Sequence, residues 1–535
     1  MIFEAVPRRA PRALPLWAAA GAVGLVTLAI ALATVSPYTV GAFQDDGTYV
    51  ILGRAIATGA GYRYLHLPGT PAATHFPPGY PALLAALWRI APQFPANVAL
   101  LLRANAVLLS VSALLGVVLA RRAKLSLPWA CAVGLIGAAS IPPLALAGML
   151  LSESAFLMVL LAALLVVEKV ARGAFPVSPD GTRTTEAGFG VACATGVLCG
   201  LVGLVRTIGV VLVPAAVVLC LARRRWRTAM GLLAGALVPL LPWQLWTLRH
   251  GGDLPTVMQG EYGSYAAWLG DPLRRHGSAF ALAVARRNLS DLGELWALHL
   301  APGLPMFVKW TAVLASLPLL GWGATGLARR APVTAAFAAL YLGVVLLWPF
   351  PPFRFVWAIW MLIVLTLVVA GVSIYESRPA SRWARASRAC GLVFAAGIGL
   401  LIIRYDIKGY RLRWWGTMQT SLSAHRAVAL TWLVAHPQLP PITMSEIEPA
   451  IYLYTGRLGV PCNAFNADEY IYPRDTARDR AILDASLHQF TVGSVIATGP
   501  ACALAALRLA SASPPRLTAI DTATAGLAVF TRSRP

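Results

Sequence analysis

The chain has 535 residues, of which 58% are hydrophobic and only 12% are charged, and its mean hydropathy is +0.67. So large an apolar share exceeds what a soluble core can bury, and it excludes a soluble globular protein. The 44 Lys and Arg outnumber the 22 Asp and Glu, which gives a net charge of +22. Because the basic residues fall in short runs between apolar stretches, the charge indicates membrane topology, and we expect no nucleic-acid partner.

Apolar segments long enough to cross a bilayer recur along the chain. A transmembrane helix needs roughly 20 apolar residues, and on that measure we predict about eleven spans in an α-helical polytopic membrane protein. Their approximate limits are 15 to 36, 97 to 120, 126 to 145, 152 to 170, 188 to 205, 207 to 222, 228 to 248, 306 to 327, 332 to 349, 354 to 375 and 389 to 403. The first is longer than the apolar core of a signal peptide, so we expect it to be retained as a membrane helix.

Basic runs between these segments predict the orientation of the chain. They are Arg121, Arg122 and Lys124; Lys169 and Arg172; Arg223, Arg224, Arg225 and Arg227; Arg329 and Arg330; and Arg378, Arg382, Arg385 and Arg388. The positive-inside rule places all of them, and the N-terminus, in the cytoplasm. An odd number of spans then puts the C-terminal tail outside. The Ala-, Arg- and Leu-rich composition fits a bacterium, so we expect the inner membrane, with the tail in the periplasm.

Three outward segments are too long to be simple turns: residues 37 to 96, 249 to 305, and 404 to 535. Function is expected there, because binding and catalytic residues concentrate on such segments. We therefore divide the chain into a membrane domain, residues 1–403 with the first two of these segments as outer loops, and an extracytoplasmic domain, residues 404–535.

The tail is more polar than the rest and mixes two kinds of pattern. Helical pieces are Leu422 to Val434, Asp475 to Phe490 and Cys502 to Ala510, and strand-like pieces are Ile442 to Ser445, Val492 to Ala497 and Leu527 to Thr531. This alternation predicts a small α/β domain. Its two cysteines, Cys462 and Cys502, are candidates for a disulfide in an oxidising compartment, and the sequence leaves their pairing open.

Two adjacent acids, Asp45 and Asp46, stand where the chain leaves the first span. Acids near the bilayer are costly and mark substrate or ion pathways. The alternative is that one of the two acids caps a surface helix that begins near Gly47. Two short surface helices are expected to frame a cavity, one with Tyr49, Leu52 and Ile56 on one face, the other with Tyr80, Leu83, Leu84 and Leu87.

His75 precedes three prolines in the segment 74 to 81, which fix the backbone before the second surface helix. A histidine on a rigid loop is suited to contact a phosphate or an acceptor hydroxyl. The alternative is an interfacial histidine that is hydrogen-bonded to the backbone.

Three further charged residues lie at the outer ends of predicted spans. Glu153 needs a partner or water there, or else serves as a first-turn acid of its helix. Arg206 is the single charge at a tight outer turn, and its alternative is snorkelling to the interface. Arg354 lies among prolines and aromatic residues, where it is suited to bidentate phosphate contacts or belongs to an aromatic belt.

These residues resemble a known family, the polytopic GT-C glycosyltransferases that use polyprenyl-phosphate sugars, including protein O-mannosyltransferases and the aminoarabinose transferase of lipid A. In that family an acidic pair is followed by Tyr, an Ala- and Arg-rich helix ending in Gly, and a Pro-Pro motif. The corresponding residues are Asp45-Asp46-Gly47-Thr48-Tyr49, Arg54-Ala55-Ile56-Ala57-Thr58-Gly59 and His75-Phe76-Pro77-Pro78-Gly79-Tyr80. Further similarities are Ser152-Glu153, Leu204-Val205-Arg206, Arg354-Phe355 and the tail segment 448 to 457.

The resemblance implies sugar transfer, with inversion, from a polyprenyl-monophosphate donor to a hydroxyl of a glycan, lipid or protein acceptor. Asp45 would be the general base. Some relatives carry Lys where Phe76 stands, so cationic residues elsewhere would hold the phosphate. The implied site comprises Asp45 and Asp46 as catalytic residues, His75, Arg206 and Arg354 as phosphate ligands, and Tyr49, Glu153 and Tyr80 as further site residues.

No octahedral carboxylate cluster is evident in the sequence, so we expect no obligatory metal or other cofactor, and a divalent cation between Asp46 and the phosphate is left open. The alternative function is a polytopic lipid or solute transporter or flippase. The charged residues gather at the outer boundary rather than at the midplane, which favours the enzyme. A non-catalytic scaffold would not account for adjacent acids beside a proline-rich loop.

Overall fold

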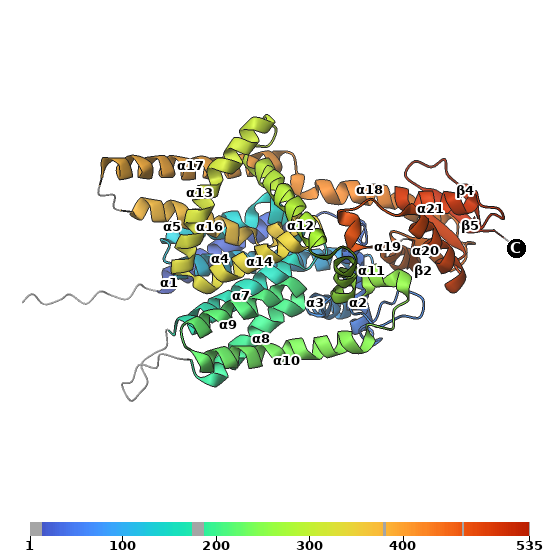
Figure 1. Cartoon of the computed structure of the whole chain (residues 1–535), viewed down its shortest axis with the longest axis horizontal. Helices are drawn as coiled ribbons and strands as arrows, with labels where there is room; N and C mark the ends of the chain where they lie inside the picture. Colours follow the sequence, from blue (N-terminus) through green and yellow to red (C-terminus); the bar gives the residue numbers. More distant parts are fainter. Residues whose placement is uncertain (1–12, 174–186, 378–380, 463–464, 534–535) are drawn as a thin grey trace, which may run out of the picture.

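The computed structural model describes residues 13–173, 187–377, 381–462 and 465–533. It shows a bundle of helices with a smaller sheet-containing domain at one end (Figure 1). Arg378, in the last predicted basic run, lies outside the described residues, as does the predicted cytoplasmic N-terminus. Helices come first along the chain and the sheet comes last.

Helices make up the whole membrane part. They are α1 (Ala13–Thr34), α4 (Val98–Arg122), α5 (Leu127–Ala139), α6 (Ile141–Ala147), α7 (Glu153–Arg172), α8 (Phe189–Val205), η1 (Thr207–Val211), α9 (Leu212–Ala222), α10 (Trp226–His250), α12 (Tyr265–Leu300), α13 (Met306–Arg330), α14 (Pro332–Leu347), α15 (Phe353–Ala358), α16 (Trp360–Glu376) and α17 (Arg382–Arg411). Each predicted span falls on one of these helices or on a consecutive pair of them.

Six helices in the described part are long and apolar enough to cross a membrane: α1, α4, α7, α10, α13 and α17. A seventh results if α5 and α6, which are bent by 49°, form one span. The chain is therefore a multi-pass membrane protein. The predicted eleven spans include α8, α9, α14 and α16, which are apolar but shorter than the roughly 20 residues that a bilayer requires.

Small residues set how closely these helices pack. Gly196 and Gly200 on α8 face α10, and Gly235 on α10 faces α8 in return. A Cβ atom at any of the three would collide with the backbone of the other helix. Because apolar side chains gain little by leaving lipid, such close backbone contact is a main source of helix association in membranes.

The second outer segment, 249 to 305, is largely one helix rather than a loop. α12 has 36 residues and is broken at Gly277, whose φ of 60° and ψ of −147° are not helical. Similarly, α17 continues to Arg411, beyond the predicted end of the last span at 403. Its C-terminal half carries polar residues, which is why hydropathy alone ended the segment too early.

Two short helices follow α1, as the apolar faces predicted: α2 (Asp45–Ala57) and α3 (Gly79–Ile90). They pack against each other and lie between the bundle and the sheet domain (Figure 1). A further short helix, α11 (Gln259–Tyr262), follows the 3-10 turn η2 (Thr256–Met258).

The C-terminal domain contains a five-stranded mixed sheet in the order β2-β1-β3-β5-β4. Its elements are α18 (Trp414–Ala435), β1 (Ile442–Ser445), α19 (Glu448–Thr455), β2 (Leu458–Pro461), η3 (Ala467–Tyr470), α20 (Thr476–Gln489), β3 (Ser494–Ala497), α21 (Pro500–Ala510), β4 (Leu517–Asp521) and β5 (Ala528–Arg532). β1 is parallel to β2 and β3, whereas β5 is antiparallel to both β3 and β4. The α/β prediction for the tail is confirmed.

Two strands of this sheet escaped the sequence analysis. β2 is four residues long and contains Gly459 and Pro461, which are poor strand formers. β4 lies at the edge of the sheet and is exposed at three consecutive positions, so it lacks the alternation that marks a half-buried strand.

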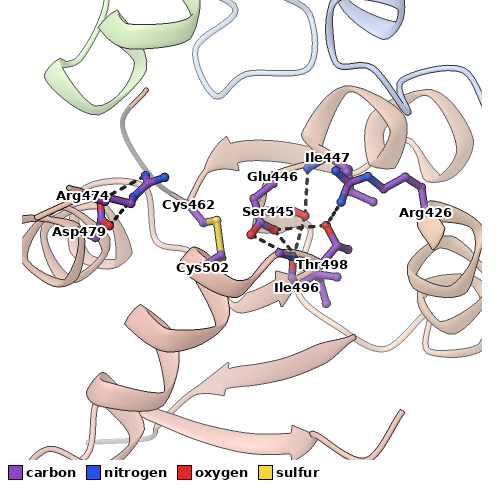
Figure 2. The surroundings of a disulfide bond; sticks show 11 residues. Arg426, Ser445, Glu446, Ile447, Cys462, Arg474, Asp479, Ile496, Thr498 and Cys502 are labelled. Atoms are coloured by element: carbon purple, nitrogen blue, oxygen red, sulfur yellow. Dashed lines mark hydrogen bonds and ion pairs between the residues drawn. A yellow bond between two sulfur atoms is a disulfide. The ribbon is translucent and has the colours of Figure 1, made fainter. Parts of the chain in front are cut away.

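Cys462 and Cys502 form a disulfide, with a Cα–Cα distance of 5.8 Å, and thus settle the pairing that the sequence left open. The bond joins the end of β2 to the first turn of α21 (Figure 2). Glu446 lies beside it and accepts hydrogen bonds from the backbone N–H groups of Thr498 and Gly499, at the start of α21. The disulfide and these hydrogen bonds just before the helix together hold its start against the parallel half of the sheet.

Candidate active site

A cavity of about 320 Å³ lies where α2, η1, α12, α14 and α15 meet. Its polar wall contains Asp45, Tyr49, His75, Arg206, Tyr265 and Arg354. The rest of the wall is apolar and rich in aromatic side chains, among them Phe76, Trp268, Trp348, Phe350, Phe355 and Phe465. Five of the eight site residues predicted from the sequence therefore line one cavity, although they are up to 309 positions apart.

Arg354 joins two of the acids. Its guanidinium donates to Asp45 Oδ2 at 2.9 Å, and to Glu153 Oε1 from Nε at 3.1 Å and from Nη2 at 3.0 Å. Arg206 approaches the same Oε1 of Glu153 at 2.8 Å. Glu153 is therefore the common partner of both arginines.

Burial of these four charges differs and suggests their roles. The side chain of Glu153 is 1% exposed, those of Arg206 and Arg354 are 11% and 13% exposed, and that of Asp45 is 36% exposed. Two carboxylates balance two guanidinium groups, as buried charges require. Asp45 is the acid with free access to the cavity, whereas Glu153 positions the arginines.

The alternatives for the outer-end charges can now be compared with their surroundings. Arg206 does not snorkel to the interface, because its guanidinium is buried against Glu153 and also donates to Ser152 Oγ at 3.1 Å. Glu153 is the first residue of α7, so it is both a first-turn acid and an ion-pair partner. Arg354 is buried in an ion-pair network rather than placed as an interfacial belt residue.

Asp46 has surroundings unlike those of Asp45. Its carboxylate is fully buried, does not line the cavity, and accepts hydrogen bonds from the backbone N–H groups of Gly41 at 2.8 Å and Phe43 at 3.0 Å. Burial raises the pKa of Asp46 to about 6. The expectation that it caps a helix starting near Gly47 is wrong, because α2 begins at Asp45 and the bonded amides precede the helix.

Tyr49 and Tyr80 form an aromatic pair beside Ser152. The hydroxyl of Tyr49 lies 3.1 Å from Ser152 Oγ, and its ring meets that of Tyr80 edge-on at a centroid distance of 5.2 Å. Tyr80 is fully buried, does not line the cavity, and donates to Asn105 Oδ1 at 3.1 Å. Of the two, only Tyr49 reaches the cavity.

His75 is hydrogen-bonded to the backbone, as its alternative interpretation held, and it also lines the cavity. Nδ1 lies 2.7 Å from the carbonyl oxygen of Gly263, so this nitrogen carries the proton. Burial lowers the pKa of His75 and keeps the ring neutral at neutral pH. Nε2 is then a hydrogen-bond acceptor, which suits a hydroxyl group better than a phosphate oxygen.

Aromatic residues that the sequence analysis did not single out complete the cavity. Tyr265 packs on His75 with ring centroids 4.0 Å apart. Trp268 donates from Nε1 to the carbonyl oxygen of Phe465 at 3.1 Å, and their rings stack. The C-terminal domain thereby contributes to the cavity wall. The clustering of Tyr and Trp in the first turn of α12 was the available signal, but nothing in the sequence ties them to Phe465.

Side chains of the types that bind metal ions lie together outside the cavity. Over the described ranges, one group of three such residues has ligand atoms close enough to share an ion: Glu446, Cys462 and Cys502. Both of its cysteines are used by the disulfide, and none of the three lines the cavity.

Comparison with known proteins shows a shared architecture. No protein-family model matches the chain, and no curated protein matches it in sequence. The structure of the oligosaccharyltransferase AglB from Archaeoglobus fulgidus, in complex with an inhibitory peptide and a dolichol-phosphate, matches with 12% identity and a TM-score of 0.50, over 90% of this chain and 69% of that one.

ArnT from Cupriavidus metallidurans, bound to undecaprenyl phosphate, matches with 14% identity and a TM-score of 0.49, over 97% of both chains. Identities this low concern the fold and not the substrate. A match over 90% of this chain extends into both the membrane helices and the C-terminal domain. The chain therefore shares its fold with the oligosaccharyltransferase AglB.

Proposed function

We propose that the chain is an integral membrane glycosyltransferase that moves a sugar from a polyprenyl-monophosphate donor to an acceptor hydroxyl on the outer face of the membrane. One observation carries this proposal: an accessible carboxylate, Asp45, shares an aromatic-lined cavity with two arginines, Arg206 and Arg354. A base beside a cationic pair is what sugar transfer from a lipid phosphate requires. The GT-C fold supports the same class of reaction.

Charge balance suggests how the donor is held. Without a donor, the arginines are neutralised by Asp45 and Glu153. A sugar phosphodiester brings one negative charge, which Arg354 can accept by exchanging Asp45 for the phosphate. Glu153, buried and bound to both arginines, keeps them in place during that exchange. Donor binding thus releases the Asp45 carboxylate at the moment when a base is needed.

The chemical step then follows from these positions. Asp45 takes the proton of the acceptor hydroxyl, and the hydroxyl oxygen bonds to the anomeric carbon from the face opposite the phosphate. The bond from that carbon to the phosphate oxygen breaks, and the lipid monophosphate leaves with the electron pair. The arginines stabilise its growing charge. One displacement inverts the anomeric configuration.

Other residues have supporting roles in this proposal. His75, neutral and with Nε2 as acceptor, is assigned to a hydroxyl of the sugar or acceptor. Asp46 is assigned to hold the loop that carries Asp45, since its oxygens are already hydrogen-bonded to the backbone. A metal at Asp46 would displace those bonds, so we propose that no divalent cation is obligatory.

The site end of the bundle is assigned to the periplasmic side of a bacterial inner membrane. Glu153 begins α7 and Arg172 ends it, so site and basic end are roughly 30 Å apart at 1.5 Å per residue. Arg223 and Arg225 donate to the backbone at the Arg172 end, so several basic runs gather there. The positive-inside rule places that end in the cytoplasm. We also propose that the shorter apolar helices cross the membrane, which brings the number of spans to about eleven.

AglB is complexed with a dolichol-phosphate, a lipid phosphate of the same chemical class as the donor proposed here. The apolar wall of the cavity, with Ile208, Val210 and Val211 from η1, offers a surface for such a lipid. The acceptor is a glycan, lipid or protein that presents a hydroxyl.

The test supplies the purified protein in lipid with a panel of polyprenyl-monophosphate sugars and cell-envelope extract, and follows donor consumption by mass spectrometry. We expect one donor to be consumed by the native protein and not by Asp45→Asn. Asp253→Asn is the matched control, because Asp253 is exposed and lies outside the cavity. If no donor is consumed, the transporter alternative gains weight, and movement of labelled lipid between leaflets becomes the next assay.

A further inference from the structure

Directly before Asp45, Gln44 reaches from the candidate site into the C-terminal domain. Its amide Nε2 donates to Glu261 Oε2 at 2.5 Å and lies 3.3 Å from Glu448 Oε1. Its backbone has a φ of 65° and a ψ of −60°, which a residue without a strong side-chain restraint rarely adopts. The side-chain contacts of Gln44 therefore keep its backbone in a strained conformation.

We propose that Gln44 is a positioning residue for sugar transfer, held by the Glu261 and Glu448 carboxyl groups so that the C-terminal domain fixes the direction of Asp45. This inference rests on the proposed function, because it concerns the base of that reaction. Gln44 itself does not line the cavity, so its effect must pass through the backbone of Asp45.

The surroundings of the two carboxyl groups support such a clamp. Glu448 begins α19 and is fully buried, and Glu261 is on α11. The hydroxyl of Tyr262 donates to Glu448 Oε1 at 2.6 Å and accepts from His66 Nε2 at 3.0 Å. Glu261 Oε2, Glu448 Oε1 and the Tyr262 hydroxyl are thus each supplied with a donor from another segment of the chain.

The clamp holds a proton where the candidate site holds arginines. Burial raises the pKa of both glutamates, the nearby charge of Glu448 raises that of Glu261 further, and a hydrogen bond from Glu261 partly lowers that of Glu448. Oε2 of Glu448 is buried and has no hydrogen-bond partner in the described part of the chain, so a proton there reduces an otherwise costly charge. The neighbouring charged groups are Glu446, which adds to the repulsion, and Arg426 and Arg474, which oppose it at longer range.

The rest of the loop is packed tightly on α19. Gly41 has a φ of +90°, and a Cβ atom there would lie 2.7 Å from the backbone nitrogen of Ala450. A Cβ at Gly47 would lie 2.9 Å from Pro449 Cβ, and the backbone N–H of Val40 donates to the Tyr454 hydroxyl at 3.2 Å. Backbone packing thus fixes both flanks of the loop, and Gln44 fixes its turn into α2.

Loss of the shared proton should weaken the clamp. With both glutamates ionised, one amide cannot satisfy two repelling carboxylates, and the Asp45 segment is held less firmly. We therefore expect the transfer rate of the native protein to fall at alkaline pH. Glu448→Gln should remove this alkaline loss, because an amide preserves the shape of the network and does not ionise.

The decisive variant is Gln44→Glu, compared with native protein and Glu448→Gln from about pH 6 to about pH 9. A third carboxyl group repels the other two when ionised and donates when protonated. The transfer rate of Gln44→Glu should therefore rise as pH falls, the reverse of what a carboxylate base alone produces.

The variant Gln44→Ala removes the contacts without adding a charge. It should lower kcat by about 10- to 100-fold and change the donor KM by less than about twofold, as a misplaced base would.

Gln259→Ala is the matched control, since Gln259 is on the same short helix as Glu261 but its side chain donates to the carbonyl oxygen of Leu254 and not to the clamp. The inference is overturned if Gln44→Glu has the pH profile of the native protein, or if Gln44→Ala changes thermal stability without changing kcat. Absence of donor consumption by the native protein would instead overturn the proposed function, and this inference with it.

Discussion

Two buried groups of charges lie on either side of residue 45, and they solve the same electrostatic problem differently. In the cavity, Asp45 and Glu153 are balanced by Arg206 and Arg354. In the Gln44 clamp, an amide and a phenol donate to two buried glutamates. Burial raises the pKa of both glutamates, which favours a proton shared within the pair. Guanidinium groups keep their charge at any physiological pH, whereas a shared proton is lost on titration.

This contrast divides the tasks between the two groups. Permanent cations suit the binding of a phosphate, because their affinity for an anion does not depend on pH. A proton-sharing pair suits the adjustable support of a loop. Anion binding should therefore be lost when the arginines change, and pH sensitivity should change with the glutamates.

The largest expected effect comes from the acid that belongs to the cavity. Asp45→Asn removes the base and leaves Arg354 paired with Glu153, so we expect transfer to fall by roughly 10²- to 10⁴-fold while the protein still folds. Single-turnover donor consumption measures this loss. Turnover near the native rate would remove Asp45 from the mechanism.

A smaller effect is expected from replacing Arg354, one of the two arginines of the cavity. Arg354→Ala should raise the donor KM by about 10- to 100-fold, since one of the two groups assigned to the phosphate is lost. Steady-state kinetics with the preferred donor provide the value. Arg287→Ala is the control, because Arg287 packs on Tyr470 outside the cavity. An unchanged KM would assign the phosphate to other residues.

Asp46→Asn should affect stability more than rate. An amide cannot accept from both Gly41 and Phe43 without presenting its own N–H groups to one of them, and an unmade buried hydrogen bond costs about 1 to 3 kcal/mol. The raised pKa of Asp46 means that its ionisation destabilises the folded state as pH rises from 3.8 to about 6. Thermal unfolding should show this loss of stability with rising pH in the native protein and a weaker loss in the variant.

The smallest effect is expected from chelation. Treatment with EDTA should leave the transfer rate within about twofold of the untreated value, since Asp46 is already hydrogen-bonded and two arginines are available for the phosphate. A complete loss that Mg²⁺ or Mn²⁺ restores would contradict the metal-free proposal.

Sequence patterns predicted the parts of this molecule that depend on local order. The apolar runs located helices, the faces of Tyr49 and Tyr80 located α2 and α3, and the tail was recognised as α/β. The charged candidates at the outer ends of the helices proved to be neighbours. The sequence indicated each of them, because an isolated charge beside a bilayer is costly without a partner.

What the sequence could not supply depends on contacts between distant segments. Asp45 and Asp46 are equivalent in sequence, and only the fold turns one into the cavity and buries the other against the preceding loop. The sequence did not indicate a role for Gln44, because an uncharged residue has no visible partner until the fold brings Glu261 and Glu448 beside it. Phe465 likewise reaches the cavity only through the docking of the C-terminal domain.

The central claim is that this cavity transfers a sugar from a lipid phosphate with Asp45 as the base. The most direct measurement incubates the protein in lipid nanodiscs with a ¹³C-labelled polyprenyl-monophosphate sugar and an acceptor fraction, then determines the anomeric configuration of the product by NMR. We predict a product of configuration opposite to the donor, absent with Asp45→Asn. A product of retained configuration, or equal yields from both proteins, would contradict the account.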